Sequence, residues 1–275
     1  MVMTTTQHII QLTNLRCAYG DGPTVLTVPQ LPLPAGELIF VVGVSGGGKS
    51  TLLETIGLMN RTLKAGEMHF AADGVDLAQL WAPSRVAELD EFRKRHYSFI
   101  FQKTNLMPNF TCGENMVLPA LFKGVDFKVA KAKVLSYMER LDLEPGIYDK
   151  RIVEVSGGQR QRLAFIRAMT ADFSILFGDE PTGNLDPNTA REVMQVLKEH
   201  LAEFGKTGIV VSHDIELAAR FADRIVPITM VATADGHAHG TVDLANILTR
   251  NAADLWADAQ REYPEPIAHL KQLIA

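Results

Sequence analysis

One short segment, Gly43 to Thr51, limits what this chain can fold into more than any other feature. It fits the pattern GxxxxGK[ST], in which glycines let the backbone curl until successive N–H groups point at a phosphate, and Lys49 adds a mobile positive charge. The residues before it, Leu38 to Val42, predict a buried strand, and Ser50 onwards predicts a helix. Such a loop needs this context, because a helix N-terminus adds roughly half a positive charge. A plain glycine-rich turn is the alternative.

Composition narrows the class of protein. The chain has 275 residues, 47% of them hydrophobic, and can bury a sizeable core, so we expect one domain with attached subdomains. The net charge of −5 and the lack of a basic run predict no nucleic-acid partner. Cys17 and Cys112 are too few for a disulfide framework or a zinc site, which favours a reducing compartment. Residues 1–10 lack the pattern of a secretory leader, and no apolar stretch approaches ~20 residues, so we expect a cytoplasmic chain.

Apolar runs that alternate with longer periodic segments predict an α/β fold with a parallel sheet. Two other regions, Ile9 to Val28 and Gly66 to Val75, predict antiparallel strands, with Asp73-Gly74 as a hairpin signal. From Val117 to about Val155 the pattern becomes helical, so we expect an α-helical subdomain inserted in the parallel-sheet core, beside an antiparallel β-subdomain. The predicted buried strands are Leu38 to Val42, Tyr97 to Phe101, Ser174 to Phe177, Ile209 to Val211 and Arg224 to Ile228.

Two adjacent carboxylates, Asp179 and Glu180, end one of these strands and therefore lie at the edge of the sheet where ligands bind. We expect Asp179 to hold Mg²⁺ through water opposite the Ser50 hydroxyl. Glu180 projects further and can accept a proton from an attacking water. A carboxylate pair in this place could instead cap the next helix.

A second possible anion site begins at Ser156, in the sequence Ser-Gly-Gly-Gln that ends at Gln159. Ser156 and Gln159 also fit a capping box at the start of a helix. A cap needs no double glycine, however, whereas backbone that lies against a phosphate does. Because one triphosphate does not need two cradles from one chain, we expect a head-to-tail pair in which Ser156 of one copy faces the nucleotide held by Lys49 of the other.

Taken together, these motifs resemble those of the ATP-binding subunits of ABC transporters, in that family's order. The resemblance implies a P-loop NTPase (RecA-like) core, ATP and Mg²⁺ as ligands, ATP hydrolysis and a homodimer. It places the cassette at residues 1–240 and the helical subdomain at about residues 104–155. The matching segments are Gly43 to Thr51 for Walker A, Phe99 to Gln102 for the Q-loop, Ser156 to Gln159 for the signature, Ile175 to Glu180 for Walker B, Gly183 to Asp186 for the D-loop and Val211 to Asp214 for the switch histidine.

The family's roles transfer to individual positions of this chain. The implied catalytic residues are Glu180, His213, Lys49 and Gln102, and the implied Mg²⁺ ligands are Ser50, Gln102 and Asp179. Tyr19 stands where the family stacks an aromatic ring on adenine, although a half-buried strand tyrosine is the alternative. The implied nucleotide-binding residues are Tyr19, Ser45, Gly46, Gly47, Gly48, Lys49, Ser50, Thr51, Ser156, Gly157, Gly158, Gln159 and Asp186.

Details after Gln102 narrow the branch. The segments Gln102 to Thr111 and Asp179 to Asp186 resemble the lipoprotein-releasing, macrolide-exporting and cell-division group, whose ATPases work with a membrane subunit. This implies a transmembrane permease that contacts the region after Gln102 through a coupling helix, with the chain peripheral on the inner face of the membrane. Ordinary core packing is the alternative for the apolar residues Met107, Phe110 and Leu118.

Three questions stay open at the level of sequence. Residues 241–275 exceed the compact ending of this branch, and we expect a helical extension that serves as a packing helix, a dimer brace or a regulatory element. A soluble ABC ATPase acting on ribosomes or DNA is a second functional class, although such proteins carry two cassettes or long insertions. A small-molecule P-loop kinase is a third, for which Ser156 and His213 would have no role.

Overall fold

The computed structural model describes residues 8–233, 236–251 and 254–274. The chain forms two compact units, one from residues 1–91 and 207–275 and the other from residues 92–206. We call them unit 1 and unit 2 and describe each by itself. The first of the two sequence boundaries between them falls within α2 (Val86–His96), and the second lies between Lys206 and Thr207.

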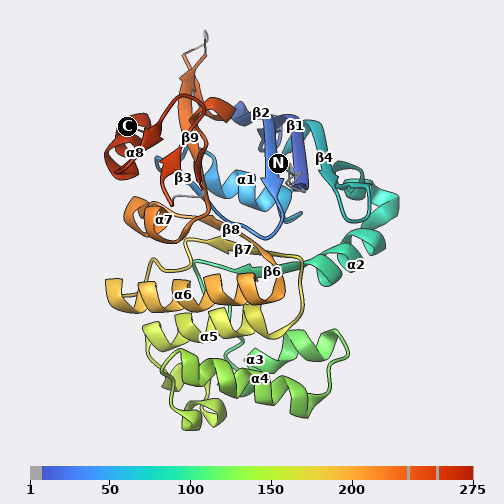
Figure 1. Ribbon diagram of the computed structural model, residues 1–275. Helices are drawn as coiled ribbons and strands as arrows, with labels where there is room; N and C mark the ends of the chain where they lie inside the picture. Colours follow the sequence, from blue (N-terminus) through green and yellow to red (C-terminus); the bar gives the residue numbers. More distant parts are fainter. Residues whose placement is uncertain (1–7, 234–235, 252–253, 275) are drawn as a thin grey trace, which may run out of the picture. The chain divides into compact units, whose positions relative to one another are not determined.

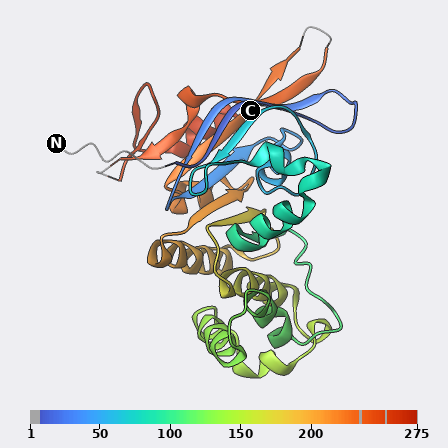
Figure 2. The same ribbon diagram turned by 90° about the vertical axis from the view of Figure 1, so that its right-hand side faces the viewer.

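Unit 1 is built on a mixed sheet in the order β5-β4-β1-β2-β10-β9-β3-β8. The parallel pairs β3 with β8 and β3 with β9 confirm the predicted α/β sheet, and every residue of β3 is buried. Figure 2 shows the antiparallel strands β1, β2 and β4 (blue to cyan) beside β9 and β10 (orange). The strands named here are β1 (His8–Ala18), β2 (Thr24–Pro34), β3 (Leu38–Gly43), β4 (Leu63–Phe70), β5 (Val75–Asp76), β8 (Thr207–Val211), β9 (Arg224–Ala232) and β10 (Ala238–Val242).

Short helices and turns complete unit 1 before the C-terminal region. The predicted hairpin at Asp73-Gly74 is confirmed, since Phe70 of β4 pairs with Val75 of β5. The helical elements are α1 (Lys49–Ile56), α7 (Ile215–Phe221) and the 3₁₀ helices η1 (Leu77–Trp81) and η2 (Pro83–Arg85).

Residues 241–275 differ from the expected helical extension. The described residues of this region contain the end of β10, η5 (Leu244–Asn246), three short strands and one helix, α8 (Pro266–Leu273) (Figure 1). Leu244, Ile247 and Leu248 have helical spacing, but the chain there extends because β11 pairs antiparallel with β9, Leu248 opposite Ile225. The strands are β11 (Leu248–Arg250), β12 (Trp256–Ala257) and β13 (Glu262–Tyr263), and they pair in that order.

Unit 2 combines one parallel strand pair with a group of helices. The pair is β6 (Tyr97–Ile100) and β7 (Ile175–Asp179), as the apolar runs predict. Among the helices, α3, α4 and α5 contact one another, and α6 contacts α5 (Figure 1). Their bounds are α3 (Cys112–Phe122), α4 (Phe127–Arg140), α5 (Gly157–Thr170) and α6 (Pro187–Phe204), with the 3₁₀ helices η3 (Pro145–Asp149) and η4 (Ile152–Glu154).

Unit 2 also contains a buried histidine, His200, on α6, which is 2% exposed. Its Nδ1 accepts a hydrogen bond from the Tyr137 hydroxyl, and its ring packs against Phe173 and Phe204. Burial, followed by the nearby positive charges of Lys133, Arg140 and Lys206, lowers the pKa of His200 to about 4, although Asp172 acts in the opposite direction.

The free energy of unfolding should therefore depend on His200 at acid pH. His200 takes up a proton near its ordinary pKa of 6.5 in the unfolded chain but only near pH 4 in the folded chain. The contribution of His200 to the free energy of unfolding is therefore fully present above pH 6.5, and the free energy falls by about 1–3 kcal/mol as the pH drops toward 4. Urea unfolding at pH 7.5 and pH 5 should show this loss, and His200→Gln should reduce it. The exposed His69 gives the control, His69→Gln, which should leave the pH dependence as it is. An identical pH dependence in native protein and His200→Gln would contradict the assignment.

Candidate functional site

The glycine-rich loop of unit 1 joins β3 directly to α1. β3 ends at Gly43 and α1 begins at Lys49, so the predicted order of strand, loop and helix is confirmed. Gly46 and Gly48 have φ angles of 77° and 91°, in the left-handed region that favours glycine. The N–H of Gly47 donates to the carbonyl of Val44 at 3.2 Å, which closes a turn within the loop.

Lys49 lies at the first position of α1 and is 7% exposed. Its ammonium donates to two carbonyl oxygens of the same loop, those of Gly43 at 2.9 Å and Val44 at 2.8 Å. These bonds hold the ammonium over the loop. A buried cation in this position attracts an anion at the N-terminus of α1.

The loop fits a phosphate group on steric grounds as well. A Cβ at Gly48 would come within 3.2 Å of the Leu26 Cβ and 3.3 Å of the Val25 carbonyl oxygen, so β2 already occupies the space a side chain would need. Backbone N–H groups at such a place are free of side-chain cover and can approach a ligand closely.

Tyr19 lies just past the end of β1 and is 52% exposed. Its hydroxyl lies 3.1 Å from Oγ1 of Thr51, which is buried on α1. This bond ties the tyrosine to the phosphate-loop helix while its ring stays accessible. The geometry favours the stacking role over a half-buried strand tyrosine.

His213 leaves the same edge of unit 1 as the phosphate loop. β3 and β8 run parallel with Val41 opposite Val211, and both chains then turn out of the sheet. His213 is exposed and is followed by Asp214, which caps α7 by accepting from the N–H of Leu217 at 2.8 Å. The structure therefore brings the glycine-rich loop and His213 to one edge, as parallel strands require.

In unit 2, Gln102, Asp179 and Glu180 also share an edge. β6 and β7 are parallel with Ile100 opposite Gly178, so the glutamine and the two carboxylates follow the carboxyl ends of neighbouring strands. Asp179 and Glu180 are partly exposed and Gln102 is exposed. Glu180 has a φ of 44°, an unusual value for a residue with a side chain. Oxygen donors of this kind suit Mg²⁺.

Ser156 caps α5 through a complete capping box. Its hydroxyl accepts from the N–H of Gln159 at 3.2 Å, and the Gln159 side chain accepts from the N–H of Ser156 at 2.8 Å. The capping interpretation is thus confirmed. Ser156 and Gly157 are nevertheless exposed, and Gly157 and Gly158 add no side chain to cover the helix N-terminus. The segment can therefore still present a positive helix end to a ligand.

Asp186 acts as the N-cap of α6. Its carboxylate accepts from the N–H groups of Asn188 and Thr189, both at 3.1 Å. Hydrogen bonds from the Thr189 side chain and backbone, together with that from Asn188, lower the pKa of Asp186. The cap keeps Asp186 ionised and fixed in place.

Two side chains of α5 that no motif singled out hold the neighbouring loops. Gln161 donates to the carbonyl of Pro181, directly after Glu180. The Arg167 guanidinium donates to the carbonyls of Thr104 and Asn105, both at 2.8 Å, and so holds the segment after Gln102. Neither contact has a local sequence signal, because each joins segments far apart in the chain.

Gly240 on β10 is a further residue that sequence reasoning missed. A Cβ at this position would overlap the carbonyl oxygen of Gly47 and come within 2.8 Å of the Ile228 side chain. β10 therefore supports the phosphate loop through close backbone contact. A glycine inside a strand is the signal that could have indicated it.

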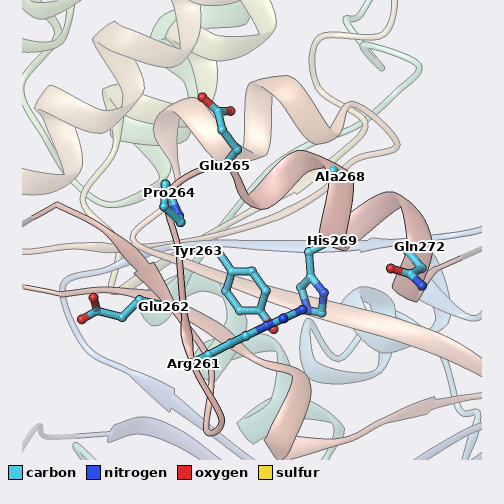
Figure 3. A pocket seen from close by; sticks show the side chains of 8 residues that line it. All are labelled: Arg261, Glu262, Tyr263, Pro264, Glu265, Ala268, His269 and Gln272. Atoms are coloured by element: carbon cyan, nitrogen blue, oxygen red, sulfur yellow. The ribbon is translucent and has the colours of Figure 1, made fainter.

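Three further observations concern metal binding, membrane spans and pockets in the described residues. In the described parts of the chain, no group of three or more His, Cys, Asp or Glu side chains is placed to hold a metal. Among the helices described, none has both the length and the apolar character needed to cross a membrane. A shallow pocket near the C-terminus, lined by Tyr263 and His269 among others, contains none of the predicted site residues (Figure 3).

Comparison with known proteins supports the motifs. The family model described as "ABC transporter" matches residues 26–183. The lipoprotein-releasing system ATP-binding protein LolD 1 of Rhodospirillum rubrum is 35% identical over 225 residues, which cover 81% of this chain and 96% of that protein. The macrolide export ATP-binding/permease protein MacB of Bordetella avium is 33% identical over 270 residues, or 95% of this chain. The match covers 38% of MacB, and that with the pyoverdine export ATP-binding/permease protein PvdT of Pseudomonas fluorescens covers 33% of PvdT, so this chain spans about a third of the length of those relatives.

Solved structures agree with these relatives. The dimeric structure of a bacterial ABC transporter cassette aligns with a TM-score of 0.70 and 34% identity, over 79% of this chain and 93% of that one. A dimeric post-hydrolysis state bound to ADP and Pi aligns with a TM-score of 0.68 and 32% identity, over the same shares of the two chains.

A side chain at Gly240 should weaken nucleotide binding. In Gly240→Ala the loop must move to relieve the overlap with Gly47, so we expect the Kd for ATP to rise at least ~10-fold, which corresponds to about 1.4 kcal/mol. Gly146→Ala is the matched control, because a Cβ there meets open space. Calorimetric titration of both variants measures the effect. A native Kd for Gly240→Ala would show that β10 does not shape the loop.

Proposed function

This chain belongs to the ABC transporter family, and we propose on that basis that two copies enclose two ATP molecules and drive a membrane permease. The chain is an ATP-binding cassette with a P-loop NTPase fold, and ATP hydrolysis is the activity of such cassettes. One observation carries the proposal that two copies pair. Two helices begin beside glycines and can each bind a phosphate: α1 after Gly48, and α5 after Ser156 with Gly157 and Gly158 as its first residues.

We propose that the loop of unit 1 binds the phosphates and that Tyr19 stacks on the base. Backbone N–H groups of residues 45–51 and the Lys49 ammonium supply the positive field. Ser50 and Thr51 add hydroxyl groups at the start of α1. Because most of these donors are backbone groups, binding depends on loop conformation more than on any single side chain.

The proposed chemistry gives each of these residues a role toward the bound nucleotide. Ser50, Gln102 and Asp179 supply the oxygen ligands that would hold Mg²⁺, which neutralises charge on the phosphates when bound. Glu180 accepts the proton of the attacking water, and His213 donates a hydrogen bond to the γ-phosphate. Catalysis then consists mainly of positioning the water in line and stabilising charge on the transferred group.

We propose that the N-terminus of α5 closes the site of the other copy. Ser156 and Gly157 are exposed and Gly158 is partly exposed, so a phosphate from a second molecule can approach this helix N-terminus. The Gln159 N–H fixes the Ser156 hydroxyl, and Asp186, the last residue of the D-loop segment, caps the start of α6. ATP would then lie in the interface and stabilise the dimer by mass action.

The membrane partner is proposed to bind the segment after Gln102, which would hold the chain on the inner face of the membrane. Arg167 and Asn115 fix this segment: the Asn115 side chain bonds to the N–H and carbonyl of Met107 at 2.7 and 3.1 Å. Phe110 remains 38% exposed. A rigid segment with an exposed aromatic ring suits an incoming helix, and the names of the relatives, a lipoprotein-releasing system and export proteins, support a permease as the partner.

Removing the proposed base should stop hydrolysis after ATP binds. Glu180→Gln keeps the shape of the side chain but not the basic oxygen, so we expect turnover to fall ~10²–10⁴-fold while the Kd for ATP stays within about twofold. A stable ATP-bound dimer should accumulate in size-exclusion chromatography with light scattering. Glu192→Gln, at an exposed position on α6, is the control. Hydrolysis at the native rate in Glu180→Gln would exclude Glu180 as the base.

Mixing two inactive variants tests the shared site. Ser156→Arg should abolish turnover but leave ATP binding to the monomer intact, whereas Ser84→Arg, at another exposed serine, should keep turnover. Lys49→Ala should be inactive because it loses the phosphate-binding cation. A mixture of Lys49→Ala and Ser156→Arg should regain activity, since the mixed dimer contains one site with both intact halves. No recovery in the mixture, or loss of monomer binding in Ser156→Arg, would contradict the arrangement in trans.

A further inference from the structure

Side chains of the C-terminal region of unit 1 form hydrogen bonds to the C-terminal end of α7, the short helix that follows His213. Its strand β11 extends the sheet by pairing with β9, and α8 contacts α7 (Figure 1). We propose that this region is a clamp on α7 that positions His213, with Arg250 as the positioning residue. The inference rests on the function proposed above for His213 and gives the C-terminal extension a role.

Arg250, the last residue of β11, satisfies the carbonyl groups at the C-terminal end of α7. Its Nη2 donates to the carbonyls of Ala219 at 2.6 Å and Arg220 at 2.9 Å, and its Nε donates to that of Ala222 at 3.0 Å. These are groups that a helix cannot pair internally, and a cation there also complements the negative helix end.

Trp256 on β12 contacts both α7 and Arg250. Its indole N–H donates to the same Ala219 carbonyl at 3.3 Å, and the Arg250 guanidinium lies 4.9 Å from the centre of its ring. The Asp254 carboxylate pairs with Arg250 at 2.6 Å. The guanidinium is thus held by an aromatic ring and a carboxylate while it bonds to α7, which leaves it little freedom.

Contacts that do not involve α7 also hold the rest of the C-terminal region together. The Tyr263 and His269 rings stack with centres 4.1 Å apart (Figure 3). The Tyr263 hydroxyl donates to Asp258 at 2.6 Å. Arg261 lies 4.8 Å from the centre of the Tyr263 ring. These contacts hold α8 against β13. Because β13 pairs with β12 and β12 with β11, the strands that contact α7 belong to an ordered, packed region.

The hydrogen bonds from Arg250 and Trp256 can influence the position of His213 because α7 is short. The helix runs from Ile215 to Phe221, a length of about 10 Å at 1.5 Å per residue. At its other end Asp214 caps the helix, directly after His213. A helix this short is not stable by itself, so its position is determined by what holds its two ends. Release of the Arg250 end should therefore disturb the placement of His213.

The test uses Arg250→Ala in the full chain. Hydrogen–deuterium exchange should become at least ~10-fold faster for the amides of α7, where protection reports local opening. The kcat for ATP hydrolysis should fall at least ~5-fold, while the Kd for ATP stays within about twofold, because the phosphate loop is untouched. Trp256→Phe keeps an aromatic ring beside Arg250 but has a smaller ring and loses the N–H bond to Ala219, so it should show a smaller change in the same direction even if Arg250→Ala folds poorly.

Arg261→Ala is the control, since Arg261 contacts Tyr263 within the C-terminal region, and it should change neither exchange in α7 nor kcat. Unchanged exchange in α7, an unchanged kcat, or a kcat loss that Arg261→Ala shares would overturn the inference. His213→Ala separates the two proposals. If it loses turnover while Arg250→Ala and Trp256→Phe hydrolyse at the native rate, the clamp is wrong and the role of His213 stands. If His213→Ala itself hydrolyses at the native rate, the proposed role of His213 is wrong.

Discussion

Close backbone packing around the phosphate loop is the constraint on which the rest of unit 1 depends. Side chains are excluded at Gly48 by β2 and at Gly240 by the loop itself, where the Gly47 carbonyl occupies the space of a Cβ. The sheet order places β10 between β2 and β9, so strands from both ends of the chain enclose a loop that follows β3. The N–H groups that would meet a phosphate are therefore set by tertiary contacts before any ligand arrives, which reduces the ordering cost of binding.

In unit 2 a single helix, α5, plays the corresponding part. Ser156 begins it, Gln161 holds the carbonyl of Pro181, and Arg167 holds the segment that follows Gln102. A displacement of the N-terminus of α5 would thus also move the loop after Glu180 and the segment that is proposed to bind the permease. The connection consists of hydrogen bonds to backbone carbonyls, so a rigid-body movement of the helix carries the attached segments with it.

The sequence predicts well those features whose cause is local. The glycine-rich loop, the buried strands and the capping box at Ser156 each depend on residues within a few positions of one another, and the structure has all three. Gly240, Arg167 and Arg250 were missed because each acts on a segment far away in the chain. The helical expectation for the C-terminal extension was wrong because the pairing of β11 with β9 also joins distant segments. Apolar spacing alone does not show such a pairing.

Glu180 shows how such distant contacts can maintain a functional geometry. A left-handed backbone costs a residue with a side chain about 1 kcal/mol, and the following Pro181 further restricts its conformation. Two hydrogen bonds offset this cost: the Gly183 N–H donates to the Glu180 carbonyl at 3.2 Å, and Gln161 holds the Pro181 carbonyl. Strain of this kind persists where the surroundings over-determine the conformation, and it is found preferentially at functional sites. The backbone conformation of Glu180 therefore agrees with the role proposed for this residue at the end of β7.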